Sequence, residues 1–285
     1  MIELLIALVL IWVIFANIQD LKSREIANWI SFSLIIFVLV IRLFYSLFSN
    51  NYWWFLFGLI GLGIFFLLGH LFYHARLFAG GDAKLFIAFG VIVPLSLSWL
   101  ENIVYAMIFI MALLFLGGIY SLVYSGVLAL KNKKSFKIEL EKQFNKNKGL
   151  LFIGLGIAFI LAFFIILLAR GNSLLFLVFS FLILLMPLLY IYTKAIEQCC
   201  MVKWVSVDKI TIGDWLVKDL EVKDRKIASN WEGISESDLE FLQKNYKNKV
   251  LVKYGIPFSP SFLFAFIVLI IVNYVGIYKI LGLMY

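Results

Sequence analysis

The chain has 285 residues, of which 64% are hydrophobic and only 15% are charged. Soluble domains contain about half apolar and about a quarter charged residues, so this composition excludes an ordinary soluble globular protein. The net charge of +8 could suggest a nucleic-acid partner. No nucleic-acid recognition motif accompanies that charge, and excess Lys and Arg is also typical of the cytoplasmic loops of membrane proteins. We therefore expect a polytopic α-helical membrane protein that does not bind nucleic acid.

Apolar runs long enough to cross a bilayer recur along the chain. The first run is long for the core of a signal peptide, and neither a preceding basic residue nor a small-residue cleavage site accompanies it, so we expect a retained span. Pro94 falls inside the fourth run and should kink or end a helix there. The sequence predicts about eight transmembrane helices, near residues 2–18, 29–48, 52–71, 85–100, 103–130, 150–169, 174–192 and 257–281.

Composition changes abruptly between residues 193 and 256. Short alternating stretches at 203–207 and 250–253 are typical of strands, and Ser235, three residues before Asp238, is typical of a capped helix start. The sequence therefore predicts a transmembrane domain, a small α+β domain and a C-terminal transmembrane helix. Their expected bounds are residues 1–192, 193–256 and 257–285.

Lysine and arginine concentrate in alternate loops. The loops at 20–28, 73–84 and 131–149 carry most of them, seven lysines in the last loop alone, whereas the intervening loops carry only Arg170. By the positive-inside rule, these loops and the α+β domain should be cytoplasmic and the N-terminus outside. The basic loop should be a solvated anchor to anionic membrane lipid.

Two carboxylates mark the ends of apolar runs. Asp20 ends the first run and Asp82 precedes the fourth, where an ionisable group is costly and is a functional candidate by default. The predicted topology places both on the cytoplasmic side. A close carboxylate pair is suited to aspartyl proteolysis, because like charges separate the two pKa values. One carboxylate then activates water while the protonated one polarises the scissile carbonyl.

Several neighbours of these acids are candidates for site support. Gly80 and Gly81 would let a peptide backbone approach without a Cβ in the way. Lys84 would either lower the pKa of the neighbouring acid or bind lipid phosphate. Lys22 and Arg24 would either enforce the topology or contribute to the site.

No metal or other cofactor is expected. His70 and His74 have i, i+4 spacing, but no glutamate lies between them in an H-E-x-x-H pattern and no third ligand is nearby. The only two cysteines are adjacent and form no C-x-x-C pair. Arg42, inside the second apolar run, should snorkel towards the outer headgroups.

Asp20 with the segment 22–28, and the run 79–84, resemble the motifs of the type IV prepilin peptidases, membrane aspartyl proteases of the G-x-G-D class that include the archaeal preflagellin peptidases. Residues 255–260 match their Gly-Ile-Pro-Phe-x-Pro-like stretch before a closing span, whereas Ala79 replaces the first motif glycine. The resemblance implies that Asp20 and Asp82 are a catalytic pair. It also implies that the pair cleaves short basic leaders from pilin-like or archaellin precursors at the cytoplasmic membrane face.

Two other functions are open at this stage. A proton-coupled transporter would use Asp20 or Asp82 as a relay. It would usually place such acids nearer the bilayer midplane and show an internal repeat, and neither feature is visible in the sequence. A catalytically silent assembly factor for surface filaments would need neither acid.

Overall fold

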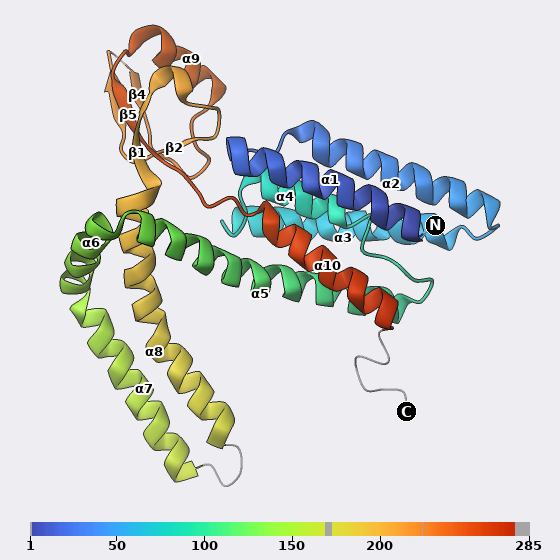
Figure 1. The fold of residues 1–285 in the computed structure, drawn as a ribbon, viewed down its shortest axis with the longest axis horizontal. Helices are drawn as coiled ribbons and strands as arrows, with labels where there is room; N and C mark the ends of the chain where they lie inside the picture. Colours follow the sequence, from blue (N-terminus) through green and yellow to red (C-terminus); the bar gives the residue numbers. More distant parts are fainter. Residues whose placement is uncertain (1, 169–172, 224, 277–285) are drawn as a thin grey trace. The chain divides into compact units, whose positions relative to one another are not determined.

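A computed structural model of the protein describes residues 2–168, 173–223 and 225–276. The chain forms two compact units, Met1–Val123 with Ile256–Tyr285, and Tyr124–Gly255. Figure 1 shows the fold along the chain. Arg170 and the end of the expected closing span lie outside the described residues.

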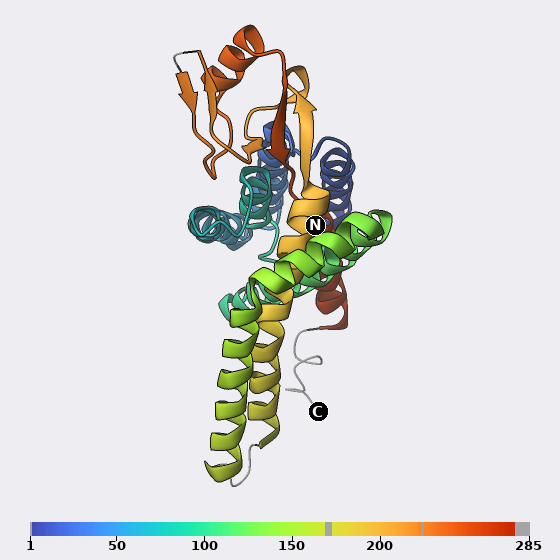
Figure 2. The same ribbon diagram turned by 90° about the vertical axis from the view of Figure 1, so that its left-hand side faces the viewer.

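The first unit is a bundle of apolar helices. Helix α3 packs on α2 and α4, and α1 packs on α2 and α10. Helices α1 to α4 run side by side in Figure 1 and are seen nearly end-on in Figure 2. Buried phenylalanines, including the stacked pair Phe89 and Phe109, fill the centre. The helices are α1 (Ile2–Ser23), α2 (Asn28–Phe48), α3 (Trp53–His74), α4 (Gly80–Phe89), the first part of α5 (Trp99–Lys131), and α10 (Ser259–Val275).

The expected helical span at 85–100 is wrong. Helix α4 has only ten residues and ends at Phe89, so at 1.5 Å per residue it is too short to cross a bilayer. The chain then continues to Pro94 without helix, and residues 91–95 are buried. Pro94 cannot continue a helix, since it lacks the backbone N–H. Helix α4 also touches α3 backbone to backbone, because a Cβ on Gly61 would overlap the Gly90 carbonyl oxygen.

Arg42 of α2 satisfies the backbone that this early helix end exposes. The expectation that it snorkels outward is wrong, because its side chain is 0% exposed. Carbonyl groups past the end of a helix lack intrahelical donors, and the planar guanidinium supplies several at once. Its nitrogens donate to the carbonyl oxygens of Val91 at 2.7 Å, Trp54 at 3.0 Å and Ile92 at 3.3 Å, and to that of Pro94.

Five helices of the described chain have the length and apolar composition needed to cross a membrane. This is the architecture expected of a polytopic helical membrane protein. The expected number of eight helical spans is not confirmed, since the helix expected at 85–100 ends at Phe89. The five are Ile2–Ser23, Asn28–Phe48, Trp53–His74, Trp99–Lys131 and Phe181–Met201.

The second unit begins with the remainder of α5 and contains a helix where a basic loop was expected. Helix α6 (Lys133–Lys146) occupies most of residues 131–149, so this connecting segment is helical, while its cytoplasmic location stays a prediction. Pairs along one face stabilise such a helix: Gln143 donates to Glu139 at 2.8 Å, and Lys142 pairs with Glu139 at 3.4 Å. Helices α7 (Lys148–Leu168) and α8 (Ser173–Ile196) then run side by side in Figures 1 and 2.

After α8 the chain forms the small α+β region that the alternating pattern predicted. The expected strands appear as β1 and β5, which pair antiparallel, and Ser235 accepts a hydrogen bond from the Asp238 amide at the start of α9. The strands form two sheets, ordered β1-β5-β2 and β3-β4. The elements are η1 (Glu197–Met201), β1 (Val202–Ser206), η2 (Val207–Lys209), β2 (Trp215–Leu216), β3 (Leu220–Val222), β4 (Arg225–Ile227), α9 (Glu236–Asn245) and β5 (Lys249–Lys253).

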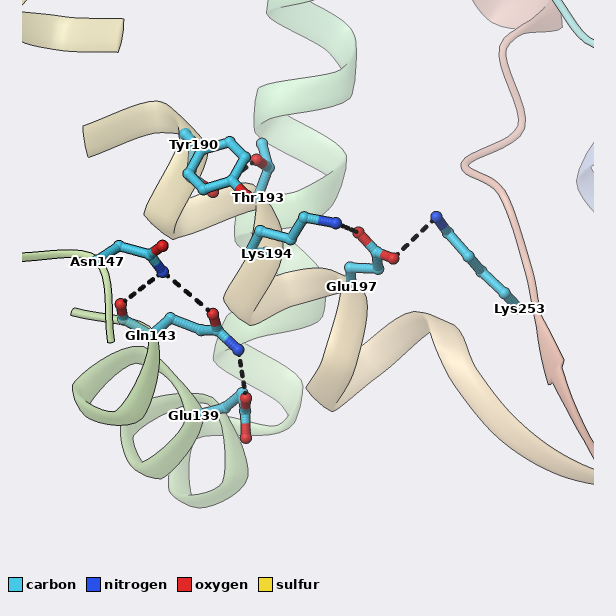
Figure 3. A network of polar contacts seen from close by, with 8 residues as sticks. All are labelled: Glu139, Gln143, Asn147, Tyr190, Thr193, Lys194, Glu197 and Lys253. Carbon is cyan, nitrogen blue, oxygen red and sulfur yellow. Dashed lines mark hydrogen bonds and ion pairs between the residues drawn. The ribbon is translucent and has the colours of Figure 1, made fainter. Parts of the chain in front are cut away.

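Polar contacts join this region to the end of α8 (Figure 3). Glu197 of η1 lies between two ammonium groups, with Lys194 at 3.0 Å and Lys253 of β5 at 2.9 Å. A carboxylate that pairs with two partly buried cations is held in one geometry better than an isolated surface pair. The junction of α8 with the sheet is therefore an ordered part of this unit.

Asp219 should make the second unit sensitive to acid. The Ser229 amide donates to its carboxylate at 2.8 Å and Lys226 pairs with it at 3.0 Å. These contacts lower the pKa of Asp219 from 3.8 to about 2. The stabilisation is present above the ordinary pKa and is lost as the pH falls towards 2.

Asp219→Asn should therefore show a smaller drop in unfolding temperature between pH 5 and pH 2.5 than the wild type, measured by near-ultraviolet circular dichroism. The effect should be modest, since the side chain is exposed. Exposed Glu232 offers a control, and Glu232→Gln should keep the wild-type pH dependence. Equal drops in the Asp219 variant and the wild type would contradict the prediction.

Candidate active site

Asp20 lies in the last turn of α1 and is only 5% exposed. It continues the buried stripe of Val13 and Ala16, because residues three or four apart share one face of a helix. Its Oδ2 atom accepts a hydrogen bond from the backbone amide of Ser259 at 3.0 Å. Ser259 is the first residue of α10, whose N-terminal amides and dipole favour a negative charge.

Asp82 is the third residue of α4, outside the five candidate spans. Its carboxylate accepts a hydrogen bond from the Ala79 amide, the reciprocal contact of a helix capping box. Burial, and next the charge of Asp20, raise the pKa of Asp82 from 3.8 to about 7, against the opposing effect of the Ala79 amide. The first turn of α4 thus holds a carboxyl group that keeps a proton near neutral pH.

The fold brings these two acids, distant in sequence, into electrostatic interaction. Helix α10 links them, because its first amide contacts Asp20 while its aromatic residues contact the segment before α4. The Phe78 ring lies 5.7 Å from that of Phe258 and 6.1 Å from that of Phe262, centre to centre. The stretch 255–260 therefore introduces the helix that contacts Asp20 and the segment before Asp82.

The two glycines before Asp82 lie in different surroundings. A Cβ on Gly81 would lie 3.3 Å from that of Ile26, so the link between α1 and α2 already occupies the space expected for a substrate backbone. The role of Gly81 beside a substrate backbone stays a prediction. Gly80 is the more open, since the nearest atom to a Cβ there would be 3.9 Å away on Tyr73. Ala79 has φ −69° and ψ 163°, an extended conformation that does not require glycine.

The three basic neighbours of the acids lie in different surroundings. The Lys84 ammonium donates to the Asn28 side chain at 2.6 Å, which ties the first turn of α4 to the start of α2. The Lys22 and Arg24 side chains are exposed. Arg24 ends α1 at φ 60°, and its amide donates to the Asp20 carbonyl at 2.8 Å. Lys84 thus helps to position the segment that carries Asp82, and the Arg24 backbone helps to end the helix that carries Asp20.

Sequence reasoning did not identify two further residues beside Asp20. The first is Ser259, whose amide contact could be suspected only from its place in the 255–260 stretch. The second is Asn17, a polar residue inside an apolar run and 7% exposed. Within the described part of the chain, no group of three or more His, Cys, Asp or Glu residues could hold a metal ion.

A bundle of apolar helices whose ends carry two interacting aspartates defines a class of protein, the membrane proteins with an intramembrane or interfacial carboxylate pair. Comparisons with known proteins show what part of this chain is similar to. Residues 7–122 match the Type IV leader peptidase family. The matched segment contains Asp20 and Asp82 and agrees with the resemblance stated from the sequence.

Two curated relatives are named preflagellin peptidases. The protein of Methanococcus maripaludis is 30% identical over 118 residues, covering 39% of this chain and 50% of the relative. That of Methanocaldococcus jannaschii is 32% identical over 84 residues, covering 30% of this chain and 36% of the relative. The chain thus spans half or less of each relative's length. No solved structure matches it.

Proposed function

We propose that this protein is a membrane-embedded aspartyl endopeptidase that removes short basic leader peptides from pilin-like or archaellin precursors. The observation that carries the proposal is the electrostatic interaction of Asp20 with Asp82. Asp20 is buried in the last turn of α1, and Asp82 is half-buried in the first turn of α4. The family match and the names of the relatives support a leader peptidase.

The two environments support different roles for the acids. Asp20 accepts a hydrogen bond from the Ser259 amide. It is the carboxylate that takes a proton from the attacking water. Asp82 keeps its proton and donates it to the scissile carbonyl oxygen as the water oxygen bonds to the carbonyl carbon. The resulting tetrahedral centre carries two hydroxyl groups. It then expels the amine, which leaves with the proton that Asp20 had taken, while one hydroxyl returns its proton to Asp82 and the carboxylic acid product forms.

We also propose that cleavage occurs at the cytoplasmic face, with the N-terminus outside and the region 193–256 cytoplasmic. The lysine and arginine distribution supports this orientation. Placement of both acids near helix ends, rather than at helix centres, favours the peptidase over the transporter. Solute uptake that depended on Asp20 or Asp82 would favour the transporter instead.

Co-expression tests the proposal. The protein is produced together with preflagellin of Methanococcus maripaludis or with pilin-like precursors from its own genome, and cleavage is scored as a shift in precursor mobility. We expect at least one precursor to be shortened. If none is shortened by the wild-type protein, the proposed function is wrong.

The pH dependence of cleavage should report the proton on Asp82. The pKa of Asp82 is raised to about 7, so the acid is protonated below that pH and ionised above it. We expect the single-turnover rate to fall towards tenfold per pH unit above about 7. A rate that stays constant up to pH 9 would contradict this assignment.

A further inference from the structure

Two buried polar side chains beside Asp20 have no hydrogen-bond partner among the described protein atoms. They are the Asn17 carboxamide, of which both the nitrogen and the oxygen are unpaired, and the Ser259 hydroxyl. Asn17 is 7% exposed and Ser259 is 0% exposed. Leaving a buried donor or acceptor unpaired costs free energy, and native proteins do so rarely, so each such group calls for an explanation.

Both side chains border the same carboxylate. Asn17 lies one helical turn before Asp20 on the buried face of α1, and at this spacing Cβ atoms are about 5–6 Å apart. Ser259 approaches from α10, and its backbone amide is already bonded to Asp20. The unpaired groups therefore flank the proposed water-activating acid from two helices that pack against each other.

Their chemistry matches a peptide group. A carboxamide offers an acceptor oxygen and donor N–H groups, and a hydroxyl can act in either role. The backbone of an extended peptide presents one N–H and one C=O per residue, which seek partners once water is excluded. No charged group is needed for this match, so such a subsite would bind backbone regardless of side-chain identity.

We propose that Asn17 and the Ser259 hydroxyl form a subsite that binds the substrate's backbone next to the scissile peptide bond. The inference rests on the proposed peptidase function and adds the residues that position the substrate. It explains why polar groups that weaken the folded state are kept beside Asp20, since a bound peptide completes their hydrogen bonds.

Asn17→Leu provides the main test, because leucine has a similar volume and removes every unpaired polar atom. We expect KM for the cleaved precursor to rise about tenfold, as for one lost hydrogen bond between buried groups, with kcat nearly unchanged. The unfolding temperature should stay equal or rise, since the unpaired groups are gone. Ser259→Ala, which keeps the backbone amide on Asp20, should also raise KM.

Ser46 supplies a matched control. Its hydroxyl is buried and equally unpaired, but it lies at the opposite end of α2 from Asn28, which contacts Lys84. The length of that helix separates it from the site. Ser46→Ala should therefore leave both KM and kcat unchanged.

The outcomes separate this inference from the function on which it rests. A wild-type KM in Asn17→Leu would overturn the subsite, and so would a raised KM accompanied by a lowered unfolding temperature, which indicates a structural role. In both cases the peptidase stands if the wild type cleaves and Asp20→Asn does not. If the wild type cleaves nothing, the proposed function and the subsite both fail.

Discussion

Asp20→Asn and Asp82→Asn should each lower the rate of leader cleavage by on the order of 10³-fold, the range expected for losing a general acid or base. Asparagine has nearly the shape of aspartate and keeps an acceptor oxygen for the Ser259 or Ala79 amide. What it lacks is the ability to exchange the catalytic proton. The loss should therefore be one of chemistry with the fold retained.

The unfolding temperatures of the two variants show whether the fold is retained. The native pKa of Asp82 is about 7 and its ordinary value 3.8, so ionising this acid costs folding stability increasingly as the pH rises from about 4 to 7. Asp82→Asn removes this cost. The variant should unfold a few degrees above the wild type at pH 8 and show no such gain at pH 4.

The measurement uses purified protein in detergent with the precursor that the wild type cleaves. Asp208 of η2 is exposed, so Asp208→Asn serves as a control and should cleave at the wild-type rate. Cleavage at the wild-type rate by either site variant would refute the carboxylate pair.

Arg42→Met should be the most destabilising single substitution that we predict. Removing a buried charge relieves its desolvation, and methionine refills part of the volume. Against this, the carbonyl groups of Val91, Ile92 and Pro94, which lie outside any helix, lose the donor that Arg42 supplies. Each buried unpaired group costs about 1–3 kcal/mol. The second effect is the larger, so we expect a net loss of about 3 kcal/mol or more.

The loss of the Arg42 contacts should also displace Asp82, because both lie on or next to α4. The Arg42 contacts hold the segment that follows α4 against α2 and α3, and the first turn of α4 carries Asp82. We expect lower unfolding temperatures and reduced cleavage together. Arg42→Lys should not restore stability, because one ammonium group cannot reach carbonyls on several sides. Lys134→Met, which alters an exposed cation of α6, should leave unfolding unchanged, and wild-type stability in Arg42→Met would contradict the prediction.

Short-range patterns in the sequence were enough to predict several features. Long apolar runs predicted α1, α2, α3 and α5, because a helix satisfies its own backbone hydrogen bonds. Alternation predicted β1 and β5, and Ser235 predicted the start of α9. The run 79–84 and Asp20 suggested the family. All these features depend on residues close in sequence, or on motifs that can be read one at a time.

Features that depend on distant contacts could not be predicted. The Arg42 side chain was expected to reach the lipid headgroups. It is buried instead, because its guanidinium donates to carbonyl groups of residues 91–94, which are distant in sequence. The basic segment at 131–149 was taken for a loop, since its helix α6 rests on contacts with α8 and η1. Gly81 faces Ile26 instead of open space, because the link after α1 folds back over it.

The amino-acid sequence is sufficient to predict a helical, apolar chain with two acids at the ends of apolar runs. Composition and local periodicity are enough for that conclusion. Only the tertiary structure decided that Asp20 and Asp82 interact, that Ser259 donates its amide to Asp20, and that Asn17 is left unpaired beside it. Such facts depend on packing between helices far apart in the chain, and no local pattern encodes which faces will meet.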